Sequence, residues 1–344
     1  MLQAFSKGVL SGNPVKRSRI VGTGSYVPSR VVDNEEVAAP LGLDPGQIVA
    51  LTGIRTRHWV AQSQASSDLA VVAGQRACEA AGVTSASVDA ILVSTTSPDS
   101  AFPSTACHVQ RALGARPVMA FDLSASCSGF LYGLSMADVM IRSGHIRSCL
   151  VIAAEVKSRF LDLRDKDTAM LFGDGAGAVL VVEDASVRPD APGILGVRLY
   201  ADGSGHGLIT IPAGGSRKPG GVETLRANEH VLRMRGSAVF RSAVRCLEQA
   251  ILDILKEFGL AAGDVTRVIA HQANARILEQ LRRRLSLSQE AVYSVIEQFG
   301  NTSSASLPIA LDHAVRAQRL KAGDLVLLGA FGGGLTWATG VVRW

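Results

Sequence analysis

Hydrophobic and polar positions alternate with two periods along the chain, and the order of these periods repeats. Short apolar runs predict buried strands, and longer stretches with helical spacing of apolar side chains predict helices that face a core. Residues 19–27 predict a first strand and residues 67–81 an amphipathic helix. After them come strands at residues 88–94, 118–123, 149–154 and 176–182 and helices at residues 104–113 and 127–142, in the order β-α-β-α-β-β.

The same order returns in the second part of the chain. It comprises strands at residues 265–270, 324–330 and 335–343, a short strand near Val292, and helices at residues 274–285 and 304–317. Two similar α/β halves packed together explain this repetition, although it is carried by pattern and hardly by residue identity. We predict an N-terminal extension (1–18), a first half (19–185) and a second half (186–344). Residues 212–228, rich in Gly, Pro and Arg and without periodicity, predict a surface loop between the halves.

Cys127 stands where the apolar run 118–123 ends and the helical pattern 127–142 begins. The unpaired N–H groups at the start of a helix stabilise a thiolate, and the small neighbours Ser126, Ser128 and Gly129 leave room for a substrate carbonyl. A cysteine in an apolar segment more often serves packing alone. These neighbours are poor core material, however, so we predict that Cys127 is a nucleophile.

His271 and Asn301 also follow apolar runs directly. Each alone is compatible with a plain structural role, the histidine as a polar strand end and the asparagine as a turn residue or helix cap. Functional side chains in α/β sheets gather beyond the carboxyl ends of strands. The combination therefore predicts a Cys-His-Asn site where the two halves meet.

Composition excludes several classes of function. The net charge of +5 is moderate and comes without long basic tracts, so an acidic protein or a small anion is a better partner than nucleic acid, although an ordinary solvated basic surface explains the charge equally well. Five cysteines, an odd number without C-x-x-C spacing, favour reduced thiols in the cytoplasm and no metal site. We expect no membrane insertion, because no apolar stretch reaches spanning length and the first eighteen residues lack a signal-peptide pattern.

Glycine-rich and arginine-rich segments allow more than one interpretation. Gly22-Thr23-Gly24 lacks the further glycine of a dinucleotide fingerprint, and the glycines of residues 172–178 lie between two strands, which favours close backbone packing over a phosphate site. The turn at residues 329–335 joins two strands and is either a plain hairpin or a source of a backbone N–H for an oxyanion. Arg276, Gln280, Arg283 and Arg284 share one helical face, which is either solvated or a docking patch for an anion.

Five motifs in order resemble the signature of a known family. They are SCSGF (126–130), FGDGAG (172–177), HQAN (271–274), GNTS (300–303) and FGGG (331–334). From about residue 19 to the last residue the chain is similar to β-ketoacyl-acyl carrier protein synthase III, in the thiolase superfamily. Asn301 distinguishes this branch from the related elongating synthases, which carry a second histidine there.

The resemblance implies a thiolase fold, layered α-β-α-β-α, a homodimer, and a decarboxylating Claisen condensation that needs no cofactor. It implies that Cys127 takes an acyl group from a thioester, and that His271 and Asn301 bind the malonyl thioester oxygen as decarboxylation creates an enolate. It places the oxyanion hole at the backbone N–H groups of Cys127 and Gly333.

The resemblance also assigns a substrate pocket and a partner. Phe102 matches a residue that crosses the dimer interface to shape the acyl pocket, to which Met170 and Phe172 are assigned as well. The basic positions that dock acyl carrier protein correspond to Arg241, Arg276, Arg283 and Arg284.

One departure leaves the acyl donor open between acyl-coenzyme A and acyl-carrier protein. Gln47 and Leu51 stand where well-studied members carry the tryptophan and arginine that hold the coenzyme A adenine, and Trp59 or Lys166 are the remaining candidates for that role. The function expected first is the initiation of fatty-acid synthesis. The alternative is a related enzyme of a secondary-metabolite (polyketide) pathway that joins or transfers carrier-bound chains. A non-catalytic partner subunit is disfavoured by the three polar residues, and a papain-like protease by the absence of its C-G-[SA]-C-[WY] site.

Overall fold

The computed structural model describes residues 17–344, except residues 187 and 189. The expected extension therefore lies almost entirely outside the described residues. Strand β1 begins at Arg17, two residues earlier than the sequence pattern indicates.

The first sheet has five strands in the order β1-β7-β6-β4-β5. Its strands are β1 (Arg17–Tyr26), β4 (Ala90–Ser94), β5 (Met119–Leu123), β6 (Ser148–Glu155) and β7 (Gly175–Asp184). Strands β4, β5 and β6 are parallel, whereas β7 and β1 run antiparallel to their neighbours. Residues expected in strands thus form them, with boundaries shifted by one or two residues.

The second sheet repeats this pairing in the order β11-β12-β13-β8. Its strands are β8 (Gly193–Ala201), β11 (Arg267–Ala270), β12 (Leu325–Gly332) and β13 (Thr336–Arg343). Strand β8, which the sequence pattern did not predict, pairs with β13 as β1 pairs with β7. The expected strand near Val292 is reduced to an isolated parallel bridge to Val268, at the edge where β5 stands in the first sheet.

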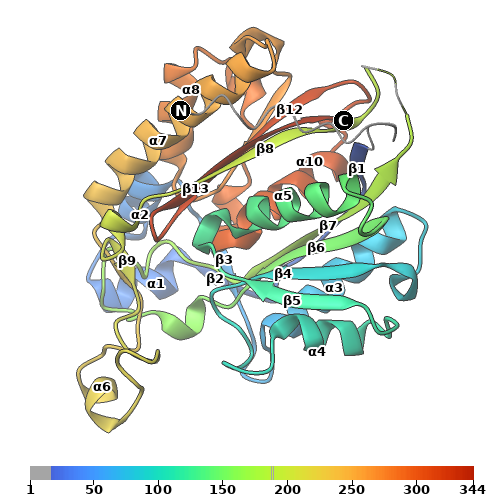
Figure 1. The fold of residues 1–344 in the computed structure, drawn as a ribbon. Coiled ribbons are helices and arrows are strands. Elements are labelled where there is room, and N and C mark those ends of the chain that lie inside the picture. The colour runs from blue at the N-terminus through green and yellow to red at the C-terminus, as the bar shows by residue number, and fades with distance from the viewer. Residues whose placement is uncertain (1–16, 187, 189) are drawn as a thin grey trace.

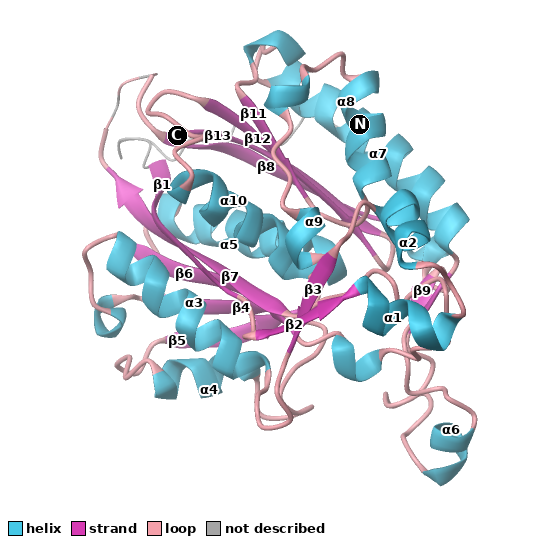
Figure 2. Cartoon of the chain, turned by 180° about the vertical axis from the view of Figure 1, so that it is seen from behind, coloured by secondary structure: helices cyan, strands magenta, loops and turns pink. Residues whose placement is uncertain are grey.

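Helices form three layers around the two sheets (Figures 1 and 2). The middle layer consists of α5 (Gly129–Arg142) and α10 (Ser306–Arg316). Helices α3 (Ser66–Ala80) and α4 (Thr105–Ala112) cover the outer face of the first sheet, and α7 (Gly236–Glu257) and α8 (Ala275–Arg284) cover that of the second. The arrangement is the layered α-β-α-β-α sandwich that was predicted. Helix α7, which was not predicted, is the counterpart of α3.

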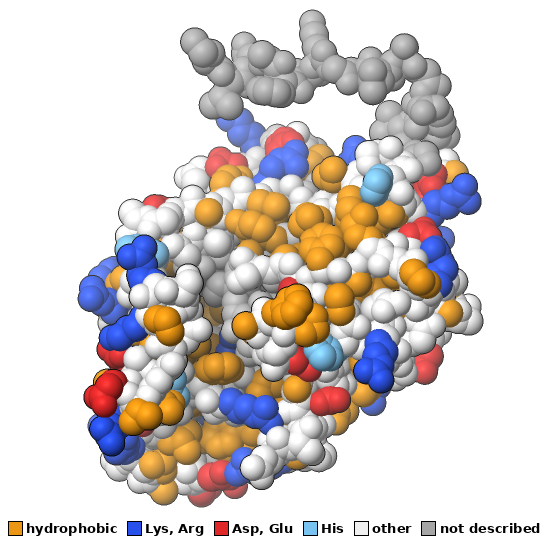
Figure 3. All heavy atoms as spheres, turned by 60° about the horizontal axis from the view of Figure 1, so that its bottom comes forward, with side chains coloured by type: hydrophobic (Ala, Val, Ile, Leu, Met, Phe, Trp, Pro, Cys, Tyr) orange, Lys and Arg blue, Asp and Glu red, His pale blue; other side chains and the backbone are white. Residues whose placement is uncertain are grey.

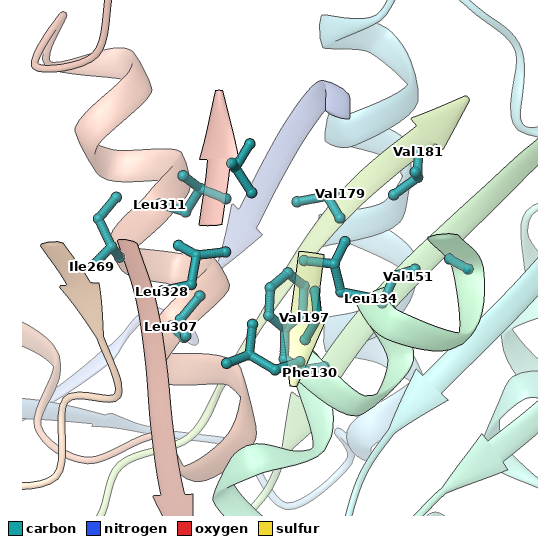
Figure 4. Close-up of a cluster of buried hydrophobic side chains, with 14 of the residues drawn as sticks. Phe130, Leu134, Val151, Val179, Val181, Val197, Ile269, Leu307, Leu311 and Leu328 are labelled. Atoms are coloured by element: carbon teal, nitrogen blue, oxygen red, sulfur yellow. The ribbon is translucent and has the colours of Figure 1, made fainter. Parts of the chain in front are cut away.

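The central core lies between the sheets, around α5 and α10 (Figure 4). Phe130 of α5 and Leu307 of α10 are fully buried there. Helix α10 approaches β7 so closely that a Cβ atom on Gly177 would lie 2.8 Å from the Cβ of Pro308. The glycines of residues 172–178 serve close packing, as the sequence indicates.

Smaller elements lie outside the main layers. They are β2 (Arg30–Asp33), α1 (Asn34–Leu41), α2 (Pro45–Thr52), β3 (Thr56–Trp59), β9 (Ile209–Thr210), α6 (Val222–Arg226), β10 (Arg233–Met234) and α9 (Ile296–Phe299). The expected loop at residues 212–228 is mostly exposed and projects from the molecule, but it contains the short helix α6 (Figure 1). None of the helices in the described part of the chain has the length and apolar character that crossing a membrane requires.

Candidate active site

Cys127 lies in a 3-10 turn, Ser126–Ser128, between β5 and α5. The regular helix begins at Gly129 and not at Cys127, so the thiol sits just before the helix N-terminus instead of inside its first turn. The residue is 9% exposed, and its Sγ lies 3.5 Å from Ser303 Oγ. Ser303 belongs to the second half of the chain, so the nucleophile faces the junction between the halves.

The turn between β12 and β13 packs directly against the cysteine. A Cβ atom on Gly332 would lie 2.5 Å from the backbone nitrogen of Cys127. The next residue, Gly333, donates its backbone N–H to Ser126 Oγ at 3.1 Å. Ser126 has a φ of 50°, which is unusual for a residue other than glycine. The Gly333 N–H thus lies beside the nucleophile and donates to the Ser126 hydroxyl.

His271 follows β11, and its Nδ1 lies 2.5 Å from Ser306 Oγ. The same oxygen accepts the backbone N–H of Gln272 at 3.1 Å. No other acceptor among the described residues is recorded for the Ser306 hydroxyl, so we assign its hydrogen to Nδ1 and the imidazole proton to Nε2. Burial lowers the pKa of His271 to about 4, against a smaller opposing effect of Glu155. The ring is neutral at physiological pH and keeps one N–H.

Asn301 follows Gly300, whose φ of 63° and lack of space for a side chain require glycine. The Asn301 backbone N–H donates to Leu171 at 2.8 Å, and its side-chain Oδ1 accepts the N–H of Ser303 at 2.9 Å. Since Oδ1 is occupied, the side-chain NH₂ is the group that remains for a ligand.

A single cavity of about 900 Å³ is lined by Cys127, His271 and Asn301 together, so the structure brings the three predicted residues into one site. Gly333, Met170 and Phe172 line it too, whereas Phe102 does not and is 88% exposed. Sequence reasoning missed much of the apolar wall, which includes Ile209, Ile211, Leu232, Met234 and Phe240.

Comparisons with known proteins identify the family. Models of the family described as 3-oxoacyl-[acyl-carrier-protein] synthase III match residues 121–203 and, for its C-terminal part, residues 255–344. A β-ketoacyl-[acyl-carrier-protein] synthase III of Caldanaerobacter subterraneus is 45% identical over 94% of this chain and 97% of its own length. The chain belongs to the synthase III family.

Solved structures of this family superpose on most of the synthase chain. The 3-oxoacyl-[acyl-carrier-protein] synthase III of Aquifex aeolicus is 38% identical, with a TM-score of 0.87 over 95% of this chain and 100% of that one. The priming β-ketosynthase of the R1128 polyketide pathway is 36% identical, with a TM-score of 0.88 over 96% and 98% of the two chains. The thiolase fold is thereby confirmed.

A buried carboxylate that sequence reasoning missed lies next to the cysteine of this synthase. Glu155 is fully buried at the end of β6, and its Oε1 accepts the hydroxyl of Ser303 at 3.1 Å and that of Ser304 at 2.8 Å. Burial opposes its ionisation, but the ammonium of Lys157 at 3.0 Å and the hydroxyl donors hold the pKa of Glu155 below its usual range. The available signal for this buried pair was the presence of Glu155 and Lys157 just after the apolar run 149–154.

The protonation of Cys127 differs from the expectation. The start of a helix predicts a thiolate near neutral pH, but burial raises the pKa of the Cys127 thiol above its usual value. The Ser303 hydroxyl and the charge of Lys157 oppose this rise, and Glu155 adds to it.

The arginines of the expected docking patch do not share one environment. Arg241 and Arg284 line a hollow of about 490 Å³, together with Gln280 and the previously unremarked Arg245. Arg284 also pairs with Glu248 at 2.5 Å, and Arg283 pairs with Glu279 at 2.5 Å. Arg276 lines the main cavity, as Arg241 also does, and donates to the carbonyl of Ala50 at 3.2 Å. Of the four arginines, Arg241 and Arg284 share the smaller hollow, whereas Arg276 and Arg283 lie outside it.

The residues that replace the adenine-holding pair have other surroundings. Leu51 is 39% exposed and lines the cavity, whereas Gln47 caps α2 by accepting the Asp44 N–H at 3.0 Å. Trp59 is only 7% exposed, and its indole N–H donates to the carbonyl of Phe172 at 3.1 Å. Trp59 was a wrong candidate for holding an adenine, because its ring is packed inside the protein.

Proposed function

We propose that this chain catalyses the decarboxylating condensation of an acyl thioester with malonyl-acyl carrier protein and thereby initiates fatty-acid synthesis. The observation that carries the proposal is the meeting of Cys127, His271 and Asn301 in one cavity. Two curated relatives that this chain matches over nearly their whole length carry the name of the enzyme of this reaction, β-ketoacyl-[acyl-carrier-protein] synthase III. The product is a β-ketoacyl-acyl carrier protein, and the steps need only protein groups and two thioesters.

In the first half-reaction the sulfur of Cys127 attacks the acyl donor and the donor thiol leaves. The backbone N–H groups of Cys127 and Gly333 stabilise the oxyanion of the tetrahedral intermediate. The Ser126 hydroxyl accepts the Gly333 N–H. This hydroxyl has to turn toward the incoming oxygen or withdraw before the Gly333 N–H can stabilise the oxyanion.

In the second half-reaction two neutral donors act on the malonyl thioester. The His271 Nε2–H and the Asn301 NH₂ bind the thioester oxygen, where negative charge grows as carbon dioxide leaves. The carbanion then attacks the acyl group on Cys127. No strong base is needed at that carbon, which agrees with a histidine whose pKa is about 4.

The partners follow from the same proposal. Acyl carrier protein, which is acidic, docks at the hollow lined by Arg241 and Arg284 beside the main cavity. A second copy of the chain binds along β5, an edge strand of the first sheet, and receives Phe102, which is 88% exposed in the single chain. Figure 3, in which the lower part of Figure 1 is turned toward the viewer, shows patches of hydrophobic side chains on this face of the molecule.

The test separates the two half-reactions. Cys127→Ala should gain no acyl mass from the donor in intact-protein mass spectrometry and should form no condensation product. His271→Ala and Asn301→Ala should still acylate but release little carbon dioxide from malonyl-carrier protein. A Cys127→Ala protein that still condenses, or normal carbon dioxide release from both other variants, would refute the proposed roles.

The similarity to the R1128 priming ketosynthase supports the alternative, an enzyme of a secondary-metabolite pathway. The curated relatives favour the initiation of fatty-acid synthesis. An enzyme that joins carrier-bound chains in a secondary pathway should turn over long carrier-bound donors faster than short ones. Efficient condensation of short donors with malonyl-carrier protein contradicts that alternative.

A further inference from the structure

Lys157 is a cation in the wall of the otherwise largely apolar cavity. It follows β6 closely and lines the cavity together with Cys127 and Thr96. Its side chain is 6% exposed, so its ammonium group is removed from bulk water. The two half-reactions described above give this group no task.

The hydrogen bonds of Lys157 leave one donor free. Its Nζ donates to Glu155 Oε2 at 3.0 Å and to Thr96 Oγ1. An ammonium group has three N–H donors. Within the part of the chain that the structure describes, the third finds no acceptor, so an acyl chain without an oxygen beside it would leave this N–H unpaired in the cavity.

Charge balance restricts what the third donor accepts. Glu155 already neutralises Lys157, and its other partners are the neutral hydroxyl groups of Ser97, Ser303, Ser304 and Thr96. A carboxylate on the substrate would add a negative charge to a buried Lys157–Glu155 pair that is already neutral, which is unfavourable. A hydroxyl or keto oxygen accepts the hydrogen bond without adding charge.

The position of Lys157 restricts where on the substrate the oxygen lies. Glu155 and Ser303 connect the ammonium to the sulfur of Cys127 through consecutive contacts of 3.0, 3.1 and 3.5 Å. Lys157 and Cys127 line the same cavity and the charge of Lys157 acts on the Cys127 thiol, so an acyl group on the sulfur begins in the neighbourhood of Lys157.

We propose that Lys157 is a specificity-determining residue that selects an acyl donor with a neutral oxygen, as hydroxyl or keto group, within the first few carbons of the chain. This inference rests on the proposed function. The oxygen accepts the third N–H of Lys157, and the rest of the acyl chain lies against the apolar wall. An unsubstituted chain leaves that N–H unpaired and is used less well.

The experiment compares butanoyl donors that carry a hydroxyl at C2, C3 or C4 with plain butanoyl and with succinyl, all on one carrier. We expect kcat/KM for condensation with malonyl-carrier protein to be about tenfold higher for at least one hydroxylated donor than for butanoyl, the discrimination of one hydrogen bond to a charged group. Equal values for butanoyl and all three hydroxylated donors would overturn the proposal, and so would a preference for succinyl.

Variants show whether the preference belongs to Lys157. Glu155→Gln with Lys157→Met removes both charges without leaving one buried alone, and the ratio of hydroxylated to plain donor should fall to about one. Lys321→Met, at an exposed lysine far from any proposed substrate contact, should keep the wild-type ratio. If Lys157 only balances Glu155, the double variant lowers kcat/KM for all donors in parallel and the ratio stays high, which contradicts the proposal.

Two different failures remain distinguishable. If no donor acylates Cys127 or condenses, the proposed function itself is wrong. If butanoyl condenses as well as its hydroxylated forms, only the role of Lys157 is wrong. The comparison of donors on the wild-type enzyme can refute the proposal by itself, even if the double variant is unstable.

Discussion

The burial of His271 predicts that the protein loses stability in mild acid through this one side chain. Its pKa is about 4 in the folded protein, against 6.5 for the unperturbed group. The unfolded chain therefore binds a proton at a pH where the folded protein does not. The free energy of unfolding should fall as the pH drops from about 6.5 to about 4, and below that window His271 causes no further loss.

The magnitude follows from the pKa difference of about 2.5, which at 1.36 kcal/mol per pH unit corresponds to about 3 kcal/mol in total. About 2 kcal/mol of this should already be lost between pH 7 and pH 5. His271→Gln removes the titrating group and should lose that much less over the same interval.

Denaturant unfolding of both proteins at pH 7, 6 and 5 measures the difference, with protein concentration held fixed because the proposed dimer would make stability depend on it. His108→Gln, which removes an exposed imidazole, is the control and should follow the wild type. The same dependence in wild type and His271→Gln would refute the reasoning. An NMR titration that places the His271 pKa above about 6 would do so directly.

Two further predictions concern the substrates. Arg241→Glu with Arg284→Glu should raise KM for malonyl-carrier protein about tenfold and flatten its salt dependence, whereas Arg283→Glu, at an arginine outside the hollow, should change it less; equal effects would contradict the assignment of the hollow. Gln47→Trp with Leu51→Arg should improve kcat/KM for acyl-coenzyme A about tenfold, or about 1.4 kcal/mol, with little change for the carrier-bound donor. A wild-type enzyme that already prefers acyl-coenzyme A, and gains nothing from the double substitution, would show that another part of the chain holds the adenine.

The catalytic candidates were predictable because each stands directly after an apolar run. Cys127, His271 and Asn301 place reactive or polar side chains just beyond these runs, where α/β sheets carry their functional groups. The two-half architecture was predictable for a similar reason, since strand and helix periods alternate in the same order twice.

The missed elements differ in their local signals. The buried side chains of α7, among them Val239, Ala243, Leu247 and Ile254, do repeat at helical spacing, but the helix begins after Arg235 without a side chain that caps it. In β8, Gly193 and Gly196 interrupt the apolar pattern. The role of Glu155 was hidden for a different reason, since its partners Ser97, Ser303 and Ser304 are distant in sequence and meet it only in the folded chain.

The central helices carry a consequence for how such a chain arose. Helix α5 of the first half packs against β8 and β13, and α10 of the second half packs against β1 and β7. Asp312 of α10 also accepts hydrogen bonds from Thr23 at 2.7 Å and Ser25 at 2.6 Å, both on β1. One half alone would expose the inner helix to water on the side that the other half now covers. A single half with this packing would therefore be stable only with a second copy beside it, which is the arrangement expected if two copies were joined in one chain.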